Sequence, residues 1–402
     1  MNILILNQHS SNHGDEAAGK ALLRGFRNFG IEDYISILYN SNKLLEIEML
    51  NIDEKTRHFC SGKATTIDKV LIILTFLLPF GFIKYFYNFG TTTKYEYNLI
   101  KKYNKVINAP GGVNIGPYKD WIYLWRLYIA IKLKKDVALY SISFGPIPES
   151  YLFKKISKYV LSNVSFLSLR DGMSQKYADN LKLNYIKSID TAFLNNNTLL
   201  SIPEEIKNII KSDYVVFVPN ELNKWHPYFK NIDSSIFDDI YLKIINYFIN
   251  QNIQIVLLPQ LFGTQNDSNY FVRLKEKSLN KYYVTVVSNT YSSDIQQNII
   301  KRSIFLVGAR YHSIIFAINN ERPFLSISYE HKMTNTLELI GLDKYNILIQ
   351  DIIDNKINIS DKLNTNYHKR NEIVMDIVKA RNNANKIAIQ TLQLLLDKYL
   401  LV

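Results

Sequence analysis

Short apolar runs alternate with longer stretches of helical periodicity along the whole 402-residue chain. The runs are rich in Ile, Leu, Val, Phe and Tyr, and most are too short to be helices. This alternation is typical of α/β proteins in which helices connect parallel strands. We therefore predict strands at 2–6, 34–39, 105–108, 137–141, 166–169, 214–219, 253–259, 282–287, 303–307 and 323–328, and helices at 15–29, 118–134, 151–162, 171–181, 235–250, 293–301, 311–319 and 368–399.

The alternation occurs twice, and a polar segment near 195–212 that contains Pro203 separates the two halves. We predict an α/β fold of two doubly wound, Rossmann-like domains that face a cleft. The predicted ranges are 1–197 for the N-terminal domain, 212–366 for the C-terminal domain and 367–402 for a closing helix. In open parallel sheets, ligands bind beyond the C-terminal ends of the strands. The residues that follow the strands are therefore the first candidates for a site.

Polar residues gather directly after the first predicted strand, in NQHSSNHGDEAAG. Asn12, His13, Asp15 and Glu16 in this segment suit the binding of sugar hydroxyls or the transfer of a proton. Asp15 and Glu16 also stand where a helix is expected to begin, and capping of that helix explains both carboxylates equally well.

Glycines and arginines follow three other strands. Gly111 and Gly112 let backbone N–H groups approach an anion closely, although a glycine pair is more often only a tight turn. Arg170 and Arg310 each stand between a strand and a helix, one in each half. A guanidinium at such a junction binds phosphate or carboxylate well. A histidine such as His312 can donate to an oxyanion or move a proton, although a lone histidine is more often structural.

The chain carries a net charge of +12, from 48 basic and 36 acidic side chains. This charge favours anionic partners, but no zinc finger, RRM-type motif or dense basic block points to nucleic acid. The single cysteine, Cys60, cannot form an internal disulfide, and the N-terminal segment lacks the features of a signal peptide. We expect a cytoplasmic protein. No metal-ligand spacing occurs in the sequence, so we predict no metal site.

Residues 70–83, VLIILTFLLPFGFI, contain no charged side chain. A spanning helix needs ~20 apolar residues, and this run is shorter and is interrupted by Pro79 and Gly81. Two interpretations remain: a buried helix, which is the usual outcome, or a segment that enters the membrane interface. The aromatic and basic residues 84–87 that follow are typical of the interfacial case.

With these segments in view, the sequence resembles the polysaccharide pyruvyl transferase family over about residues 2–335. The resemblance rests on NHGDE at 12–16, PGG at 110–112, SISFGPI at 141–147, LSLRDGMS at 167–174, IDTAF at 189–193, LLPQ at 257–260 and GARYHSIIFAINNERPFLSISYEHK at 308–332. Two positions depart from the family pattern. Val113 stands where a third glycine is common, and Tyr311 replaces an aliphatic residue between Arg310 and His312.

The resemblance implies a fold like that of GT-B glycosyltransferases. It also implies transfer of a pyruvyl group from phosphoenolpyruvate to two hydroxyls of one sugar, which gives a cyclic ketal and phosphate. By motif, the residues that bind phosphoenolpyruvate are Arg170, Arg310, Tyr311, His312, Gly111 and Gly112. We further predict His312 as proton donor or phosphate ligand and Asp15 as base, with Asn12, His13 and Glu16 at the acceptor. No cofactor other than this co-substrate is expected.

The acceptor is expected to be a sugar of a bacterial surface polysaccharide or its lipid-linked precursor at the inner face of the cytoplasmic membrane. Residues 70–90 then provide peripheral contact with that membrane. The alternative function is a GT-B glycosyltransferase with a nucleotide-sugar donor, whose ribose would need a carboxylate such as Glu221 or Glu330. A third interpretation is a non-catalytic carbohydrate-binding protein, against which the presence of both arginines and His312 argues.

Overall fold

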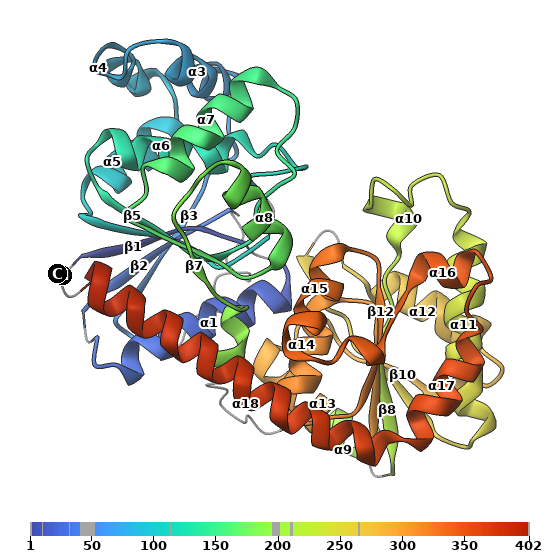
Figure 1. Ribbon diagram of the computed structural model, residues 1–402. Helices are drawn as coiled ribbons and strands as arrows, with labels where there is room; N and C mark the ends of the chain where they lie inside the picture. Colours follow the sequence, from blue (N-terminus) through green and yellow to red (C-terminus); the bar gives the residue numbers. More distant parts are fainter. Residues whose placement is uncertain are drawn as a thin grey trace. The chain divides into compact units, whose positions relative to one another are not determined.

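The computed structural model describes residues 2–9, 11–31, 33–40, 53–112, 114–194, 202–209, 212–263 and 266–400. The chain divides into two compact units (Figure 1). Unit 1 comprises residues 1–10, 18–196 and 386–402, and unit 2 comprises residues 11–17 and 197–385. Residues 195–201, 210 and 211 of the predicted linker 195–212, and the departing Val113, lie outside the described residues.

Unit 1 contains a seven-stranded sheet with the order β3-β2-β1-β4-β5-β6-β7, and all its pairings are parallel. Helices α5, α6 and α7 cover one face, and α1 and the end of α18 lie on the other (Figure 1). The elements are β1 (Ile3–Gln8), α1 (His13–Asn28), β2 (Ile35–Tyr39), β3 (Thr56–Cys60), α3 (Thr66–Leu77), α4 (Phe80–Ile83), η1 (Lys84–Phe89), α5 (Thr92–Lys101), β4 (Lys105–Asn108), α6 (Trp121–Lys132), β5 (Asp136–Ile142), α7 (Tyr151–Ser162), β6 (Phe166–Leu169), α8 (Gly172–Asn180), β7 (Ile186–Lys187) and η2 (Thr191–Leu194).

Unit 2 contains a six-stranded parallel sheet with the order β10-β9-β8-β11-β12-β13. Helices α13, α14 and α15 cover one face, and α11, α12 and α17 cover the other (Figure 1). The elements are α9 (Glu204–Ile209), β8 (Tyr214–Val218), α10 (Leu222–Trp225), α11 (Ser234–Asn250), β9 (Gln254–Leu257), α12 (Ser268–Lys277), η4 (Lys281–Tyr283), β10 (Val284–Val286), α13 (Ser293–Arg302), β11 (Phe305–Gly308), α14 (Tyr311–Asn319), β12 (Phe324–Ser328), α15 (His331–Ile340), η5 (Asp343–Tyr345), β13 (Asn346–Leu348), α16 (Ile349–Ile353), α17 (Ile359–His368), α18 (Arg370–Leu395) and η6 (Leu396–Leu400).

Strands β1, β2, β8 and β11 are buried along their whole length, as expected when helices cover both faces of a parallel sheet. In each sheet the strand order reverses at one point, between β1 and β4 in unit 1 and between β8 and β11 in unit 2. Ligands of doubly wound sheets bind at this point, beyond the C-terminal strand ends. The predicted fold class, two doubly wound α/β domains, is therefore confirmed.

Two strands of unit 1 are irregular near their C-terminal ends. Asn7 in β1 and Ser141 in β5 have left-handed backbone conformations, with φ of 61° and 48°. The register of each strand shifts at the same place. Such bulges redirect side chains and are frequent beside functional sites.

The observed units differ from the predicted ranges in two places. Residues 11–17, which were assigned to the N-terminal domain, pack with unit 2. The closing helix α18 is not a separate part, because residues 370–385 belong to unit 2 and residues from Lys386 onward belong to unit 1. There the Tyr399 hydroxyl donates to the carbonyl of Val106 in β4 at 2.8 Å.

The apolar run at 70–83 forms the end of α3 and the short helix α4. Within the described ranges, no helix has both the length and the apolar character needed to cross a membrane.

Candidate functional site

Arg310 stands at the N-terminus of α14, directly after β11 and therefore at the point where the strand order of unit 2 reverses. The turn needs Gly308, because a Cβ there would lie 2.5 Å from Ser313 Oγ and 2.7 Å from Ile314 Cδ1. The Ser313 hydroxyl donates to the Arg310 carbonyl at 2.6 Å. The tight strand–helix junction thus fixes the backbone from which the arginine projects.

The Arg310 guanidinium is held from two sides. Its Nη2 donates to Asp267 Oδ1, while Asp267 Oδ2 accepts the backbone N–H groups of Gln260 and Leu261 at 3.0 and 2.9 Å. The Trp225 ring lies 5.9 Å from the guanidinium carbon, within cation–π range. Arg310 is only 9% exposed, and its Nε has no hydrogen-bond partner among the described residues. A buried, oriented cation with an unused donor suits an anionic ligand.

Asn220 connects the two strand ends at this point. Its Nδ2 donates to the Ala309 carbonyl at 3.2 Å, and its Oδ1 accepts the Trp225 Nε1–H at 3.0 Å. The Asn220 carbonyl also accepts from the buried Tyr241 hydroxyl at 2.9 Å. The sequence predictions missed Asn220, Trp225 and Asp267, although Asn220 closely follows a predicted strand.

The segment with the NHGDE motif contacts the same part of unit 2. The His13 N–H donates to the Gln260 carbonyl at 3.0 Å, and Asn12 pairs with Leu261 in an antiparallel bridge. Gly14 lies against the His312 ring so closely that a Cβ would stand 1.9 Å from Nδ1. The structure therefore brings the predicted acceptor segment beside the predicted proton donor, and Asp15 is the next residue along the chain.

His13 and Glu16 form a buried hydrogen-bonded pair, with His13 Nδ1 2.7 Å from Glu16 Oε2. The other ring nitrogen of His13 lies 2.9 Å from the Asn289 carbonyl. Glu16 Oε1 accepts both the backbone N–H and the hydroxyl of Ser293, at the start of α13. These contacts dock the first turn of α1 onto unit 2. The roles of His13 and Glu16 at an acceptor stay predictions.

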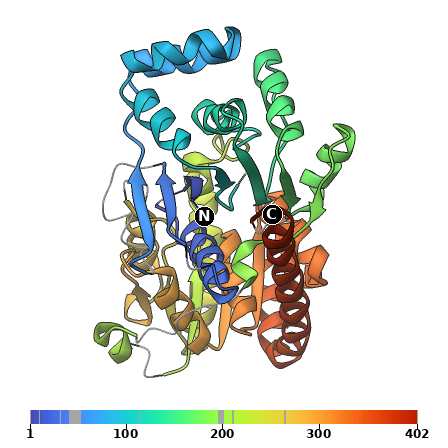
Figure 2. The same ribbon diagram turned by 90° about the vertical axis from the view of Figure 1, so that its left-hand side faces the viewer.

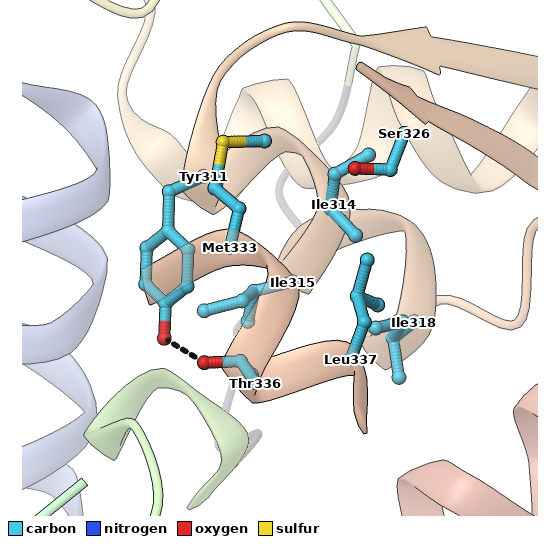
Figure 3. Close-up of a pocket in the computed structure, with 8 residues that line it drawn as sticks. All are labelled: Tyr311, Ile314, Ile315, Ile318, Ser326, Met333, Thr336 and Leu337. Carbon is cyan, nitrogen blue, oxygen red and sulfur yellow. Dashed lines mark hydrogen bonds between the residues drawn. The ribbon is translucent and has the colours of Figure 1, made fainter. Parts of the chain in front are cut away.

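Tyr311 directs its hydroxyl into the interior of unit 2, where it lies 3.2 Å from Thr336 Oγ1 of α15 (Figure 3). The ring borders a small apolar cavity between α14, α15 and β12, lined also by Ile315, Met333 and Leu337. The volume open to water is about 10 Å³, which holds no more than about one water molecule. This cavity is therefore too small for a substrate.

The remaining predicted donor residues lie in unit 1. Arg170 follows β6 and is 3% exposed; its Nη1 donates to Asp190 at 2.5 Å and its Nε to Ser143 Oγ at 2.9 Å. The Ser143 N–H in turn donates to the Gly111 carbonyl at 3.3 Å. The PGG, SISFGPI, LSLRDGMS and IDTAF segments thus meet at one edge of the sheet.

Gly112 differs from Gly14 in what a side chain would meet. A Cβ at Gly112 would have no atom within 4 Å, and neither Gly111 nor Gly112 has a positive φ. Packing and backbone conformation therefore do not require glycine at 112, which leaves room for a ligand to approach the backbone.

We predict that Gly14→Ala lowers the free energy of unfolding by about 1–3 kcal/mol, because the new methyl group displaces the His312 ring. Alanine is otherwise preferred over glycine in a helix, so without the contact with His312 the substitution would raise the free energy of unfolding. A decrease therefore indicates the clash with the His312 ring. Gly112→Ala is the matched control and should stay within about 0.5 kcal/mol of wild type. Urea unfolding measures both. A Gly14→Ala protein as stable as wild type would contradict the observed packing.

A second charged cluster surrounds Glu330, at the start of α15. Its carboxylate lies 3.3 Å from His226 Nε2 and 2.7 Å from Lys332 Nζ. Burial favours a raised pKa, but Lys332 and His226 outweigh it and lower the pKa of Glu330 from 4.5 to about 2. Since the folded state holds the ionised carboxylate, its contribution to stability is present above pH 4.5 and is lost as the pH falls through about 2.

We therefore predict that Glu330→Gln lowers stability by on the order of 2 kcal/mol at neutral pH. The difference between the free energies of unfolding of Glu330→Gln and wild type should become steadily smaller below pH 4.5. Urea unfolding at a series of pH values tests this. A difference that stays constant into the acid range would contradict the ionised state of Glu330.

The described part of the chain contains no group of three or more His, Cys, Asp or Glu side chains that could hold a metal ion. The predicted site residues form two sets. Asn12, His13, Asp15, Glu16, Arg310, Tyr311 and His312 lie in unit 2, and Gly111, Gly112 and Arg170 lie in unit 1.

The family model for polysaccharide pyruvyl transferases matches residues 12–331, a span that begins and ends with the segments described above. The chain belongs to the polysaccharide pyruvyl transferase family. This confirms the resemblance inferred from the motifs. The amylovoran biosynthesis protein AmsJ of Erwinia amylovora is 25% identical over 311 residues, which are 73% of this chain and 74% of that protein. Together, family and relative support a pyruvyl-transfer role in polysaccharide synthesis.

Solved structures share the fold at low sequence identity. UDP-GlcNAc 2-epimerase of Methanocaldococcus jannaschii aligns with a TM-score of 0.62 and 14% identity over 98% of this chain and 99% of that one. The spinosyn rhamnosyltransferase SpnG aligns with a TM-score of 0.54 and 10% identity over 99% of each chain. These likenesses confirm the predicted GT-B-like fold of two parallel-sheet α/β domains, and they show the fold alone.

Proposed function

We propose that this member of the family transfers a pyruvyl group from phosphoenolpyruvate to two hydroxyls of one sugar, forming a cyclic ketal and releasing phosphate. The observation that carries the proposal is Arg310: it is buried, oriented by Asp267 and placed at a helix N-terminus, and its Nε donor has no partner among the residues that the structure describes. Phosphoenolpyruvate carries a phosphate and a carboxylate, and either group accepts charge-assisted hydrogen bonds from a guanidinium.

Five further residues are assigned to the donor. His312 is two residues from Arg310 and lies 8% exposed beside Gly14, so one short turn presents both a fixed cation and a titratable ring. Tyr311 is assigned to the donor with them, although its hydroxyl is directed towards Thr336 in the interior of unit 2. We assign Arg170, Gly111 and Gly112 to the same donor as part of this proposal, although they belong to unit 1.

The proposed reaction begins when His312 donates a proton to the methylene carbon of phosphoenolpyruvate, which becomes the methyl group of the ketal. The neighbouring carbon takes on oxocarbenium character, and the first sugar hydroxyl adds to it. The C–O bond to phosphate then breaks, and the second hydroxyl closes the ring. Of the two hydroxyl protons, one restores His312 and the other leaves with phosphate. Asp15 is proposed to accept the proton of the first hydroxyl as it adds and to pass that proton to the phosphate, so that the second hydroxyl proton restores His312.

We propose a sugar of a bacterial surface polysaccharide, or its lipid-linked precursor, as the acceptor, with the enzyme working at the inner face of the cytoplasmic membrane. Asn12, His13 and Glu16 are assigned to the acceptor side. Nucleic acid has no part in the proposal, and neither does a metal or another cofactor, so the activity is expected to survive EDTA.

The alternative, a glycosyltransferase with a nucleotide-sugar donor, needs a carboxylate for the ribose hydroxyls. Both carboxylates considered for that role bind cations of the chain. Glu221 Oε1 accepts from Arg273 at 2.9 Å, and Glu330 is held by His226 and Lys332. Since both carboxylates are already engaged by cations of the chain, these contacts favour phosphoenolpyruvate over a nucleotide sugar as the donor.

The reaction is tested by incubating the protein with phosphoenolpyruvate and a lipid-linked oligosaccharide fraction. Release of phosphate is measured beside the mass of the saccharide. The expected result is phosphate release that depends on the acceptor, with a mass increase equal to one pyruvate ketal per acceptor. Arg310→Ala should abolish both signals, and Arg302→Ala, which changes an exposed arginine of the same unit, should leave them unchanged. Phosphate release without any gain in saccharide mass would overturn the proposal.

A further inference from the structure

The outward side of α3 is apolar, which is unusual for a helix at a protein surface. Ile67, Val70 and Leu77 project from this side at helical spacing and are 54, 52 and 60% exposed. The opposite side of the helix carries Asp68, Leu71, Ile72 and Thr75, all of them buried. The helix is therefore apolar on its exposed side as well as over much of its buried side.

The buried side of α3 is firmly attached to unit 1. The Thr75 hydroxyl lies 2.8 Å from the Tyr87 hydroxyl and accepts the Trp125 Nε1–H at 3.2 Å. Asp68 caps α3 and also accepts the backbone N–H of Thr93 at 2.9 Å. Since these contacts fix the rotation of the helix, the exposure of its other side is built into the fold.

Aromatic side chains extend the apolar surface beyond α3. Phe82 in α4 is 55% exposed, and Tyr85 and Phe89 in η1 are 67 and 71% exposed. In both views α3 and α4 lie at the end of unit 1 farthest from its sheet (Figures 1 and 2). We call the exposed side chains of Ile67, Val70, Leu77, Phe82, Tyr85 and Phe89 the outer face.

Within residues 61–100, the stretch that carries the outer face, the exposed charges have one sign. Between residues 61 and 100, the side chains of Lys63, Lys69 and Lys94 are exposed and that of Lys84 is half-buried. The only acidic residues of this stretch, Asp68 and Glu96, are both 0% exposed, and each is satisfied internally, Glu96 by Arg126 at 2.6 Å. Lys84 Nζ lies 5.0 Å from the centre of the Tyr85 ring, next to the apolar surface.

We infer that the outer face docks on the surface of a bilayer that contains anionic lipids, with the aromatic rings at the level of the headgroups. Exposed apolar and aromatic side chains, in a stretch (61–100) whose exposed charges are all lysines, match the apolar and anionic layers of such a membrane. A protein partner would need matching acidic residues, and a second copy of this surface would bring lysines against lysines. The inference is independent of the reaction proposed above, and it would bring the enzyme to a lipid-linked acceptor.

Flotation of the full-length protein with vesicles tests the inference. Wild type should float with vesicles of phosphatidylglycerol and phosphatidylcholine and remain unbound with phosphatidylcholine alone. Leu77→Glu should weaken binding at least about tenfold, because it places a charge in the apolar layer. Replacing Lys69 and Lys94 with glutamine should weaken it about fivefold per lysine. Leu279→Glu, at a 68% exposed position of unit 2, is the matched control and should bind like wild type.

Several outcomes would overturn the inference. Wild type that does not float, or a Leu77→Glu protein that floats as well as wild type, would do so. Equal flotation with both kinds of vesicle would refute the role of the lysines. Light scattering that shows a wild-type dimer, dissociated by Leu77→Glu, together with no flotation, would assign the outer face to self-association. Unchanged thermal unfolding confirms that each variant is folded, as expected for substitutions at exposed positions.

Discussion

Arg310→Ala is expected to lower the affinity for phosphoenolpyruvate about a hundredfold. A hydrogen bond that involves a charged group contributes about 1.5–3 kcal/mol, so loss of the guanidinium should cost about 3 kcal/mol. The effect is large because Arg310 is buried and already oriented by Asp267, so little order has to be imposed when the donor binds. Equilibrium dialysis with labelled phosphoenolpyruvate measures the change.

Two further variants make this prediction specific. Arg302→Ala removes an exposed arginine from the same unit and should bind the donor like wild type. Asp267→Asn keeps Arg310 but removes the negative charge that orients it, and should weaken binding by less than Arg310→Ala does. If Arg310→Ala binds phosphoenolpyruvate as tightly as wild type, the anion site of the protein lies elsewhere.

Arg126→Ala is expected to lower the free energy of unfolding by about 3–5 kcal/mol, because it leaves the carboxylate of Glu96 buried without its cation. Arg126 is 2% exposed and makes two hydrogen bonds to Glu96, at 2.8 and 2.6 Å. It also donates to Asn7 and Ser61, both at 2.9 Å, and to Asn40. One side chain of α6 thereby holds the ends of β1, β2 and β3.

A double substitution separates the cost of the unpaired charge from the loss of the network. Replacing both Arg126 and Glu96 with leucine should recover part of the stability, but not all, because Asn7 and Ser61 lose their donor. Lys281→Ala is the control, since its pair with Glu276 is about half exposed on both sides and should contribute no more than about 1 kcal/mol. Urea unfolding that places Arg126→Ala within 1 kcal/mol of wild type, about the effect of the control, would contradict the network.

The sequence predicted most strands of both sheets because their residues are apolar on both sides. It missed three. β3 (Thr56–Cys60) carries Arg57 and His58 and is the outermost strand of its sheet, so it pairs with a neighbouring strand on one side only. β7 and β13 are also edge strands, of two and three residues. β7 and β13 are too short, and β3 is too polar, to show a hydrophobic pattern, whereas the short edge strand β10 was found because it lies in the longer apolar run 282–287.

The site was predicted in part. Residues directly after strands were found, because the end of an apolar run is visible in the sequence. Asp267 and Trp225, which hold Arg310, come from loop and helix positions that no pattern marks. The docking of residues 11–17 onto unit 2 was also missed, because it depends on a glycine that fits the His312 ring and on the pair of His13 with Glu16. Such fits between distant segments have no signature in a single sequence.

We propose phosphoenolpyruvate, and not a nucleotide sugar, as the donor. Calorimetric titration of the wild-type protein with phosphoenolpyruvate, UDP and CMP tests it most directly. We expect saturable binding of phosphoenolpyruvate and no heat of binding with either nucleotide. Binding of UDP or CMP without binding of phosphoenolpyruvate would contradict it and would identify the protein as a glycosyltransferase.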